Sequence, residues 1–95
     1  MNFTPSTEKQ KGMLGHQLRE SHEGAFERTD LDRELVEEIK RYNEQGDLDK
    51  WETSTLIEIV LDYNNARYEM NPILIKRTNA MLRQVQAQVI KRKSS

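Results

Sequence analysis

The stretch from Asn71 to Arg92, NPILIKRTNAMLRQVQAQVIKR, decides the fold. Its inward positions repeat at intervals of 3, 4, 3 and 4 residues, and they are Ile75, Thr78, Leu82, Val85 and Val89. This spacing lets a helix present one stripe to a neighbouring helix. Pro72 suits the first turn of a helix, and three basic residues suit its negative C-terminal end. We therefore expect a long helix over residues 73–92.

The segment before Asn71 predicts a partner for this helix, over residues 50–70. One face of it carries Leu56, Ile59, Val60 and Tyr63. Pro72 disfavours helical backbone at Asn71, so the helix should end there. Because only these two residues separate the helices, we expect them to be antiparallel neighbours.

A further helix is expected over residues 30–45. Its apolar stripe has a period close to 3.6 residues and consists of Leu31, Leu35, Val36, Ile39 and Tyr42. Thr29 or Asp30 can cap its start. Gly46 is suited to the left-handed conformation in which many helices end.

The N-terminal segment, residues 1–29, gives the weakest pattern. Thr7 and Gln10 have capping-box spacing, which predicts a helix at about residues 7–21. Gly12 and Gly15 lie inside it, and each costs about 1 kcal/mol relative to alanine. We expect this segment to be partly flexible and to become ordered on binding a partner, whereas residues 30–95 form the helical core domain.

These elements predict an all-α fold of three to four helices. The helices should form an antiparallel hairpin or bundle with a long C-terminal helix. Three helices would leave part of the last stripe uncovered, which predicts a homodimer through the third and fourth helices. The alternative is a monomeric four-helix bundle in which the first helix covers that stripe.

Composition and charge narrow the classes of function. The chain of 95 residues has no cysteine, so it has neither disulfides nor thiolate metal ligands. No apolar run is long enough for a membrane span, and we expect a cytoplasmic protein. Residues 1–71 hold all 16 acidic residues and nine basic ones, whereas residues 72–95 hold six bases and no acid. This asymmetry indicates either internal pairing or a basic tail with an acidic partner.

The stretch GDLDKWETSTLIE, residues 46–58, has acidic residues at some positions of a calcium loop. With Asp47 as the first ligand, however, Trp51 stands where an oxygen ligand belongs and Glu52 replaces the glycine. The corner between two helices is the better interpretation, and no metal site is expected. The start of the next helix stays open, because both Asp49-x-x-Glu52 and Thr55-x-x-Glu58 have capping-box spacing.

No constellation of catalytic residues stands out, and we expect no enzyme activity and no cofactor. The two histidines, His16 and His22, are six residues apart and would point to different faces of a helix. The sequence has no phosphate-binding glycine loop. No carboxylate falls on an apolar stripe where burial would perturb it.

The sequence therefore predicts a small interaction module that regulates, inhibits, adapts or chaperones a larger protein through helical surfaces. The expected contact residues are Trp51, Tyr68, Leu74, Met81, Arg83, Ile90, Lys91 and Arg92. The alternative is nucleic-acid binding through the basic C-terminal helix, with Lys91, Arg92 and Lys93 on the phosphates. A weaker alternative is that the acidic residues 1–71 mimic DNA.

Overall fold

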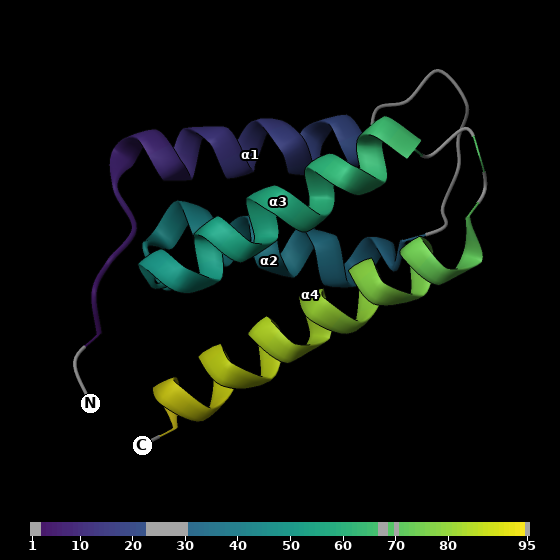
Figure 1. Cartoon of the computed structure of the whole chain (residues 1–95). Coiled ribbons are helices and arrows are strands. Elements are labelled where there is room, and N and C mark those ends of the chain that lie inside the picture. Colours follow the sequence, from purple (N-terminus) through teal and green to yellow (C-terminus); the bar gives the residue numbers. More distant parts are fainter. Residues whose placement is uncertain (1–2, 23–30, 67–68, 70, 95) are drawn as a thin grey trace.

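The computed structural model describes residues 3–22, 31–66, 69 and 71–94. These contain four helices and no strand, which confirms the all-α prediction with a long last helix (Figure 1). The helices are α1 (Glu8–His22), α2 (Arg33–Gln45), α3 (Lys50–Ala66) and α4 (Pro72–Lys93). The third helix is described as far as Ala66, and most of the last four residues expected in it lie outside the described part of the chain.

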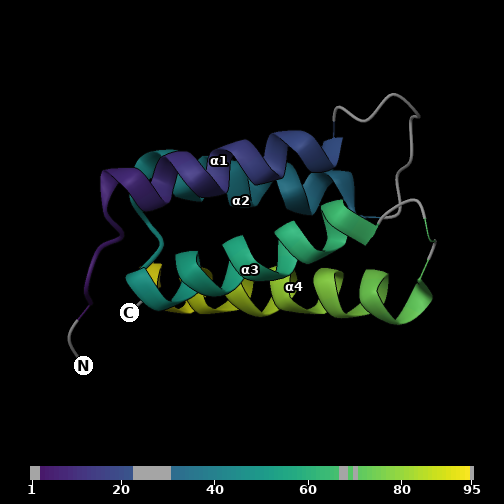
Figure 2. The same ribbon diagram turned by 45° about the horizontal axis from the view of Figure 1, so that its top comes forward.

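The four helices form a bundle in which α1 and α3 pack together, α2 and α4 pack together, and α1–α2 and α3–α4 complete the ring. The chain runs in the same direction in α1 and α3, and in the opposite direction in α2 and α4 (Figures 1 and 2). The predicted antiparallel pairing of the last two helices is thus present. Parallel packing of α1 on α3 was not foreseen.

Side-chain caps set most helix starts. Asp32, not Thr29 or Asp30, caps α2: its carboxylate accepts a hydrogen bond from the amide of Leu35 at 3.3 Å. The expected cap was wrong because Leu31 is itself a buried core residue outside the helix, and the cap must follow it. Leu31 and Val36, both buried, have the spacing of a hydrophobic staple around this cap.

Three other local signals act at helix ends as predicted. Gln10 and Thr7 form the expected capping box, with the Gln10 amide 3.1 Å from the Thr7 hydroxyl and the Thr7 amide 2.9 Å from the Gln10 side-chain oxygen. Gly46 ends α2 at φ 76°, in the left-handed region. The side-chain oxygen of Asn71 caps α4 by accepting a hydrogen bond from the amide of Ile73, and Pro72 occupies the first turn.

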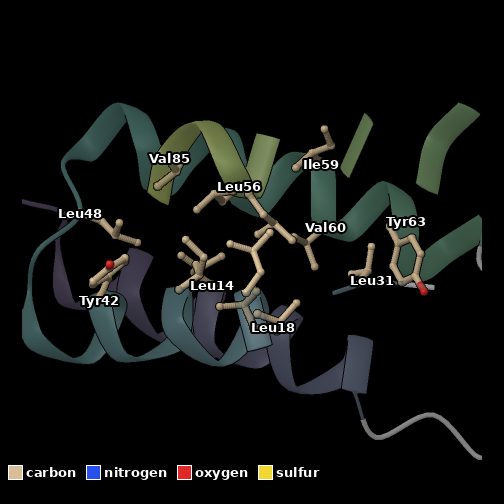
Figure 3. Packing of buried hydrophobic residues seen from close by; sticks show 14 of the residues in the cluster. Leu14, Leu18, Leu31, Tyr42, Leu48, Leu56, Ile59, Val60, Tyr63 and Val85 are labelled. Carbon is tan, nitrogen blue, oxygen red and sulfur yellow. The ribbon is translucent and has the colours of Figure 1, made fainter. Parts of the chain in front are cut away.

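The core lies between all four helices and includes α1 (Figure 3). Leu14 and Leu18 of α1 are both fully buried, against Leu56 and Val60 of α3 among others. Residues 1–29 therefore contribute more to the core than the sequence indicated, through Leu14 and Leu18. Residues 23–29, on which the predicted flexibility mainly rests, lie outside the described part of the chain.

The inner stripe of α4 is covered within one chain. Thr78, Leu82, Val85 and Val89 are buried, while Ile75 and Met81 are half-buried and pack against the core. The covering comes from α2 and α3, because α4 packs on both and lies diagonally across from α1. An uncovered inner stripe was the reason for expecting a homodimer; self-association stays a prediction.

Candidate protein-interaction surfaces

The corner between α2 and α3 is joined to the end of α4 by a buried ion pair. The side chain of Glu52 is 1 % exposed, and both of its oxygens accept hydrogen bonds from the guanidinium of Arg92 at 2.8 and 2.9 Å. Glu52 also accepts the amide of Asp49 at 2.9 Å, and Asp49 accepts the amide of Glu52 at 2.7 Å. Asp49, not Thr55, is therefore the cap of α3.

Arg92 has further contacts at this corner. It donates to the backbone oxygen of Asp47 at 2.7 Å, and its guanidinium lies 4.9 Å from the centre of the Phe3 ring. The hydrogen bond to Glu52 raises the pKa of Arg92 above its ordinary value. Arg92 is thus a positively charged structural residue. Its guanidinium is already engaged within the chain, so this geometry does not support the prediction that Arg92 contacts a partner.

Lys93 also points back to this corner. Its amine lies 2.8 Å from the carboxylate of Asp47 and 5.3 Å from the ring centre of Tyr42. Burial, together with a hydrogen bond with Glu38, raises the pKa of Tyr42 above its ordinary value. Two of the three terminal bases are therefore neutralised inside the molecule, as internal charge pairing requires.

Three of the four acidic residues in the stretch 46–58 are used in the same contacts, whereas Glu58 is exposed. Asp49 and Glu52 cap α3, and Asp47 pairs with Lys93. Within residues 3–22, 31–66, 69 and 71–94, no group of three or more potential ligands is placed to hold a metal ion. His16 lies 3.8 Å from Glu20 on the surface of α1, and the side chain of His22 is outside the described set.

Trp51 lies on the surface at the first turn of α3. Trp51 is 56 % exposed, so it lies outside the core, and its contact with a partner stays a prediction. It borders a hollow together with Thr4 and Ser54. The backbone oxygen of Thr4 accepts the Lys50 amide at 2.8 Å, so the N-terminal segment forms one wall of this hollow.

A second hollow continues along the seam between α1 and α3. Its apolar lining consists of Met13 from α1 and Ile57 and Leu61 from α3, and we call it the α1–α3 groove. Met13 and Leu61 are exposed. Gln10 and Ser54, which line the hollow at Trp51, are joined across the α1–α3 seam by a hydrogen bond of 2.9 Å.

The sides of the groove are held in register. Gln10 of α1 bonds Ser54 of α3 at one end, and the Asn64 amide donates to the backbone oxygen of Gln17 at 2.9 Å at the other. These two contacts are seven residues apart on α1 and ten residues apart on α3. The groove is therefore a fixed feature of the packed helices, with Trp51 extending the same surface of α3.

The predicted contact residues of α4 do not form a single patch. Leu74 and Met81 are half-buried, and Met81 packs on the core. Arg83 and Ile90 are exposed on the outside of the helix, as is Lys91, which has an interaction within the chain. Tyr68 lies outside the described residues.

Sequence reasoning missed two features. Glu52 is buried although no apolar stripe marks it; the only signal was its capping-box spacing with Asp49, and its partner Arg92 is 40 residues away. The α1–α3 groove was also missed, because it arises only when Met13 meets Leu61 across two helices. The one signal of this groove in the sequence was the pair Ile57 and Leu61, which are four residues apart and lie next to the buried face of α3.

Comparison with known proteins identifies no relative. No protein-family model, no curated protein and no solved structure matches the chain. Within the described residues, no helix has both the length and the apolar character needed to cross a membrane. Inference about function therefore rests on the surfaces described above.

Proposed function

We propose that this protein is a small non-enzymatic interaction module that binds a larger protein and regulates, inhibits, adapts or chaperones it. The observation that carries the proposal is the α1–α3 groove with Trp51 beside it. Exposed apolar side chains that line one hollow on rigid helices are typical of a protein-binding surface.

The shape of the groove favours a helix as the bound element. A groove between two packed helices accepts the apolar face of an amphipathic helix, with anchors three to four residues apart. The distance along α3 from Trp51 to Leu61 is about 15 Å, which corresponds to three turns of a bound helix. Tryptophan and methionine suit this role, because tryptophan is enriched among residues that dominate binding and methionine adapts its shape.

Nucleic-acid binding remains the second candidate, and the contacts of α4 make it the weaker one. Of the three bases expected on the phosphates, Arg92 and Lys93 are paired with acidic residues of the corner. A chain that binds nucleic acid through α4 would show steep salt dependence, whereas binding through an apolar groove should depend weakly on salt.

The test is a single charge placed in the groove. Replacing Leu61 with lysine should weaken partner binding at least about tenfold, because the ammonium group would be buried without a counter-ion in the complex. Asn65→Lys is the matched control, since Asn65 is exposed on the same helix outside the groove lining. Circular dichroism should show both variants folded.

The measurement is isotope-coded affinity purification with the tagged chain as bait, followed by titration of the recovered partner. We expect a protein that the wild type and Asn65→Lys retain and Leu61→Lys loses. Equal retention by all three chains would refute the groove as the contact surface. Recovery of nucleic acid alone would favour the second candidate.

A further inference from the structure

The outside of α4 carries a second stripe with the spacing of a helix–helix seam. We call it the outer stripe, and its residues follow one another at intervals of 3, 4, 3, 4 and 3: Ile73, Lys76, Ala80, Arg83, Ala87 and Ile90. All six are exposed. The inner stripe, with the same kind of spacing, packs the bundle from the opposite side of the helix. The outer stripe has no such cover among the described residues.

The two ends of the outer stripe are apolar. The side chain of Ile73 is 73 % exposed and that of Ile90 is 51 % exposed. They are separated by about 26 Å along the helix. Ala80 and Ala87 lie between them and leave room for another backbone to approach, since the distance between packed helices depends on the side chains at the contact.

The charged residues within the outer stripe have one sign, although Arg83 also borders a hollow that three glutamates of α2 help to line. Residues 72–95 contain no acidic residue, and Lys76 and Arg83 stand within the stripe with Arg77 beside it. Among the described residues, none of these three bases forms an ion pair with a carboxylate. The contrast with Arg92 and Lys93 is direct, because those two bases at the end of the same helix are both paired.

We propose that the outer stripe of α4 binds an acidic amphipathic helix of a partner protein. Apolar residues of that helix would cover Ile73 and Ile90, its small or apolar residues would pass over Ala80 and Ala87, and its carboxylates would meet Lys76 and Arg83. This surface is separate from the α1–α3 groove. The protein would then have two independent contact surfaces, as an adaptor requires.

Charge also decides between this partner and the two others that the stripe could meet. A second copy docking through its own outer stripe would bring the bases of both copies together, and like charges at an interface are unfavourable. A nucleic acid would satisfy the bases but would leave the two isoleucines uncovered. An acidic helix satisfies both sets of residues.

The test uses two synthetic peptides of about 20 residues, long enough to span the stripe as a helix. Both carry leucines at seam positions; one carries glutamates placed to face Lys76 and Arg83, and the other carries lysines there. We expect the acidic peptide to bind at least about tenfold more tightly than the basic one. Binding is measured by fluorescence anisotropy of the labelled peptides at physiological salt.

Charge reversal locates the binding site. The double variant Lys76→Glu, Arg83→Glu should lose the acidic peptide and gain the basic one. The control Lys9→Glu, Arg19→Glu makes the same change in net charge on exposed residues of α1 and should bind like the wild type. Leu61→Lys should also leave this binding unchanged, so failure of the groove proposal and failure of this one are distinguishable.

The proposal is overturned if the acidic peptide fails to bind or if charge reversal at Lys76 and Arg83 leaves its binding intact. It is also overturned if a labelled duplex DNA of random sequence displaces the acidic peptide and binds more tightly. Dimerisation of the wild type that the Lys76→Glu, Arg83→Glu variant abolishes would assign the stripe to a second copy instead.

Discussion

Replacing Arg92 with methionine should lower the free energy of unfolding by about 3 kcal/mol, because it leaves the carboxylate of Glu52 buried without a counter-ion. The variant also loses the hydrogen bond to the backbone of Asp47 and the contact with Phe3. The side chain of Arg92 is itself about a third exposed. Water can therefore reach part of the site, which places the expected loss at the lower end of the range for buried pairs.

The measurement is urea unfolding followed by circular dichroism. Arg83→Met is the matched control: it makes the same chemical change on an exposed part of α4 and should alter stability by less than about 0.5 kcal/mol. The double variant Glu52→Leu, Arg92→Met removes both charges and should recover much of the loss, since an apolar pair can replace a buried ion pair. Indistinguishable stabilities of Arg92→Met and Arg83→Met would contradict the structural role of Arg92.

Replacing Leu14 with alanine should destabilise the protein by about 2–5 kcal/mol, the usual cost of emptying a fully buried leucine site. Leu14 is fully buried between α1 and the rest of the core. For a small domain with a stability of about 5–15 kcal/mol, this is a large fraction of the total. The prediction tests whether α1 belongs to the folded unit in the absence of a partner.

Met13→Ala is the control for this substitution. Met13 directly precedes Leu14 in α1, loses the same number of heavy atoms on this change and is exposed, so its replacement should cost less than about 0.5 kcal/mol. Thermal unfolding of both variants gives the comparison. If the two substitutions have the same small effect, α1 does not contribute to the core of the free protein and becomes ordered only on binding.

Local signals in the sequence were sufficient for most of the fold. Gly46, Pro72 and the Thr7–Gln10 capping box act within a few residues of their own position, so residue type and spacing predict them. The inner stripe of α4 was also predictable, because spacings of alternately 3 and 4 residues mark one face of a helix regardless of the element that packs on it. The cap of α2 failed at Asp32, where a buried leucine outside the helix shifted the boundary.

Contacts between distant segments were less predictable. The excess of bases after residue 71 indicated internal pairing or an acidic partner, and the structure shows internal pairing for two of these bases. Arg92 and Lys93 are paired internally, whereas Lys76 and Arg83 face outward. Which bases are paired depends on which side of α4 meets the corner between α2 and α3. No local pattern in the sequence indicates that side.

The packing of α1 was underestimated for a related reason. Its two glycines and small number of apolar residues indicate a weak helix by intrinsic propensity. Tertiary contacts outweigh that propensity, because Leu14 and Leu18 insert fully into the core beside α3. The same packing creates the α1–α3 groove, so the candidate site escaped sequence analysis together with the helix arrangement that forms it.

Site-specific photo-cross-linking tests most directly whether this protein acts by binding another protein through the α1–α3 groove. A benzophenone amino acid would replace Leu61 in one chain and Glu44, which is exposed on α2, in the control chain. On irradiation in cells that express the protein, we expect a discrete protein adduct from position 61 and none from position 44. No adduct at position 61, or the same adducts from both positions, would contradict the account.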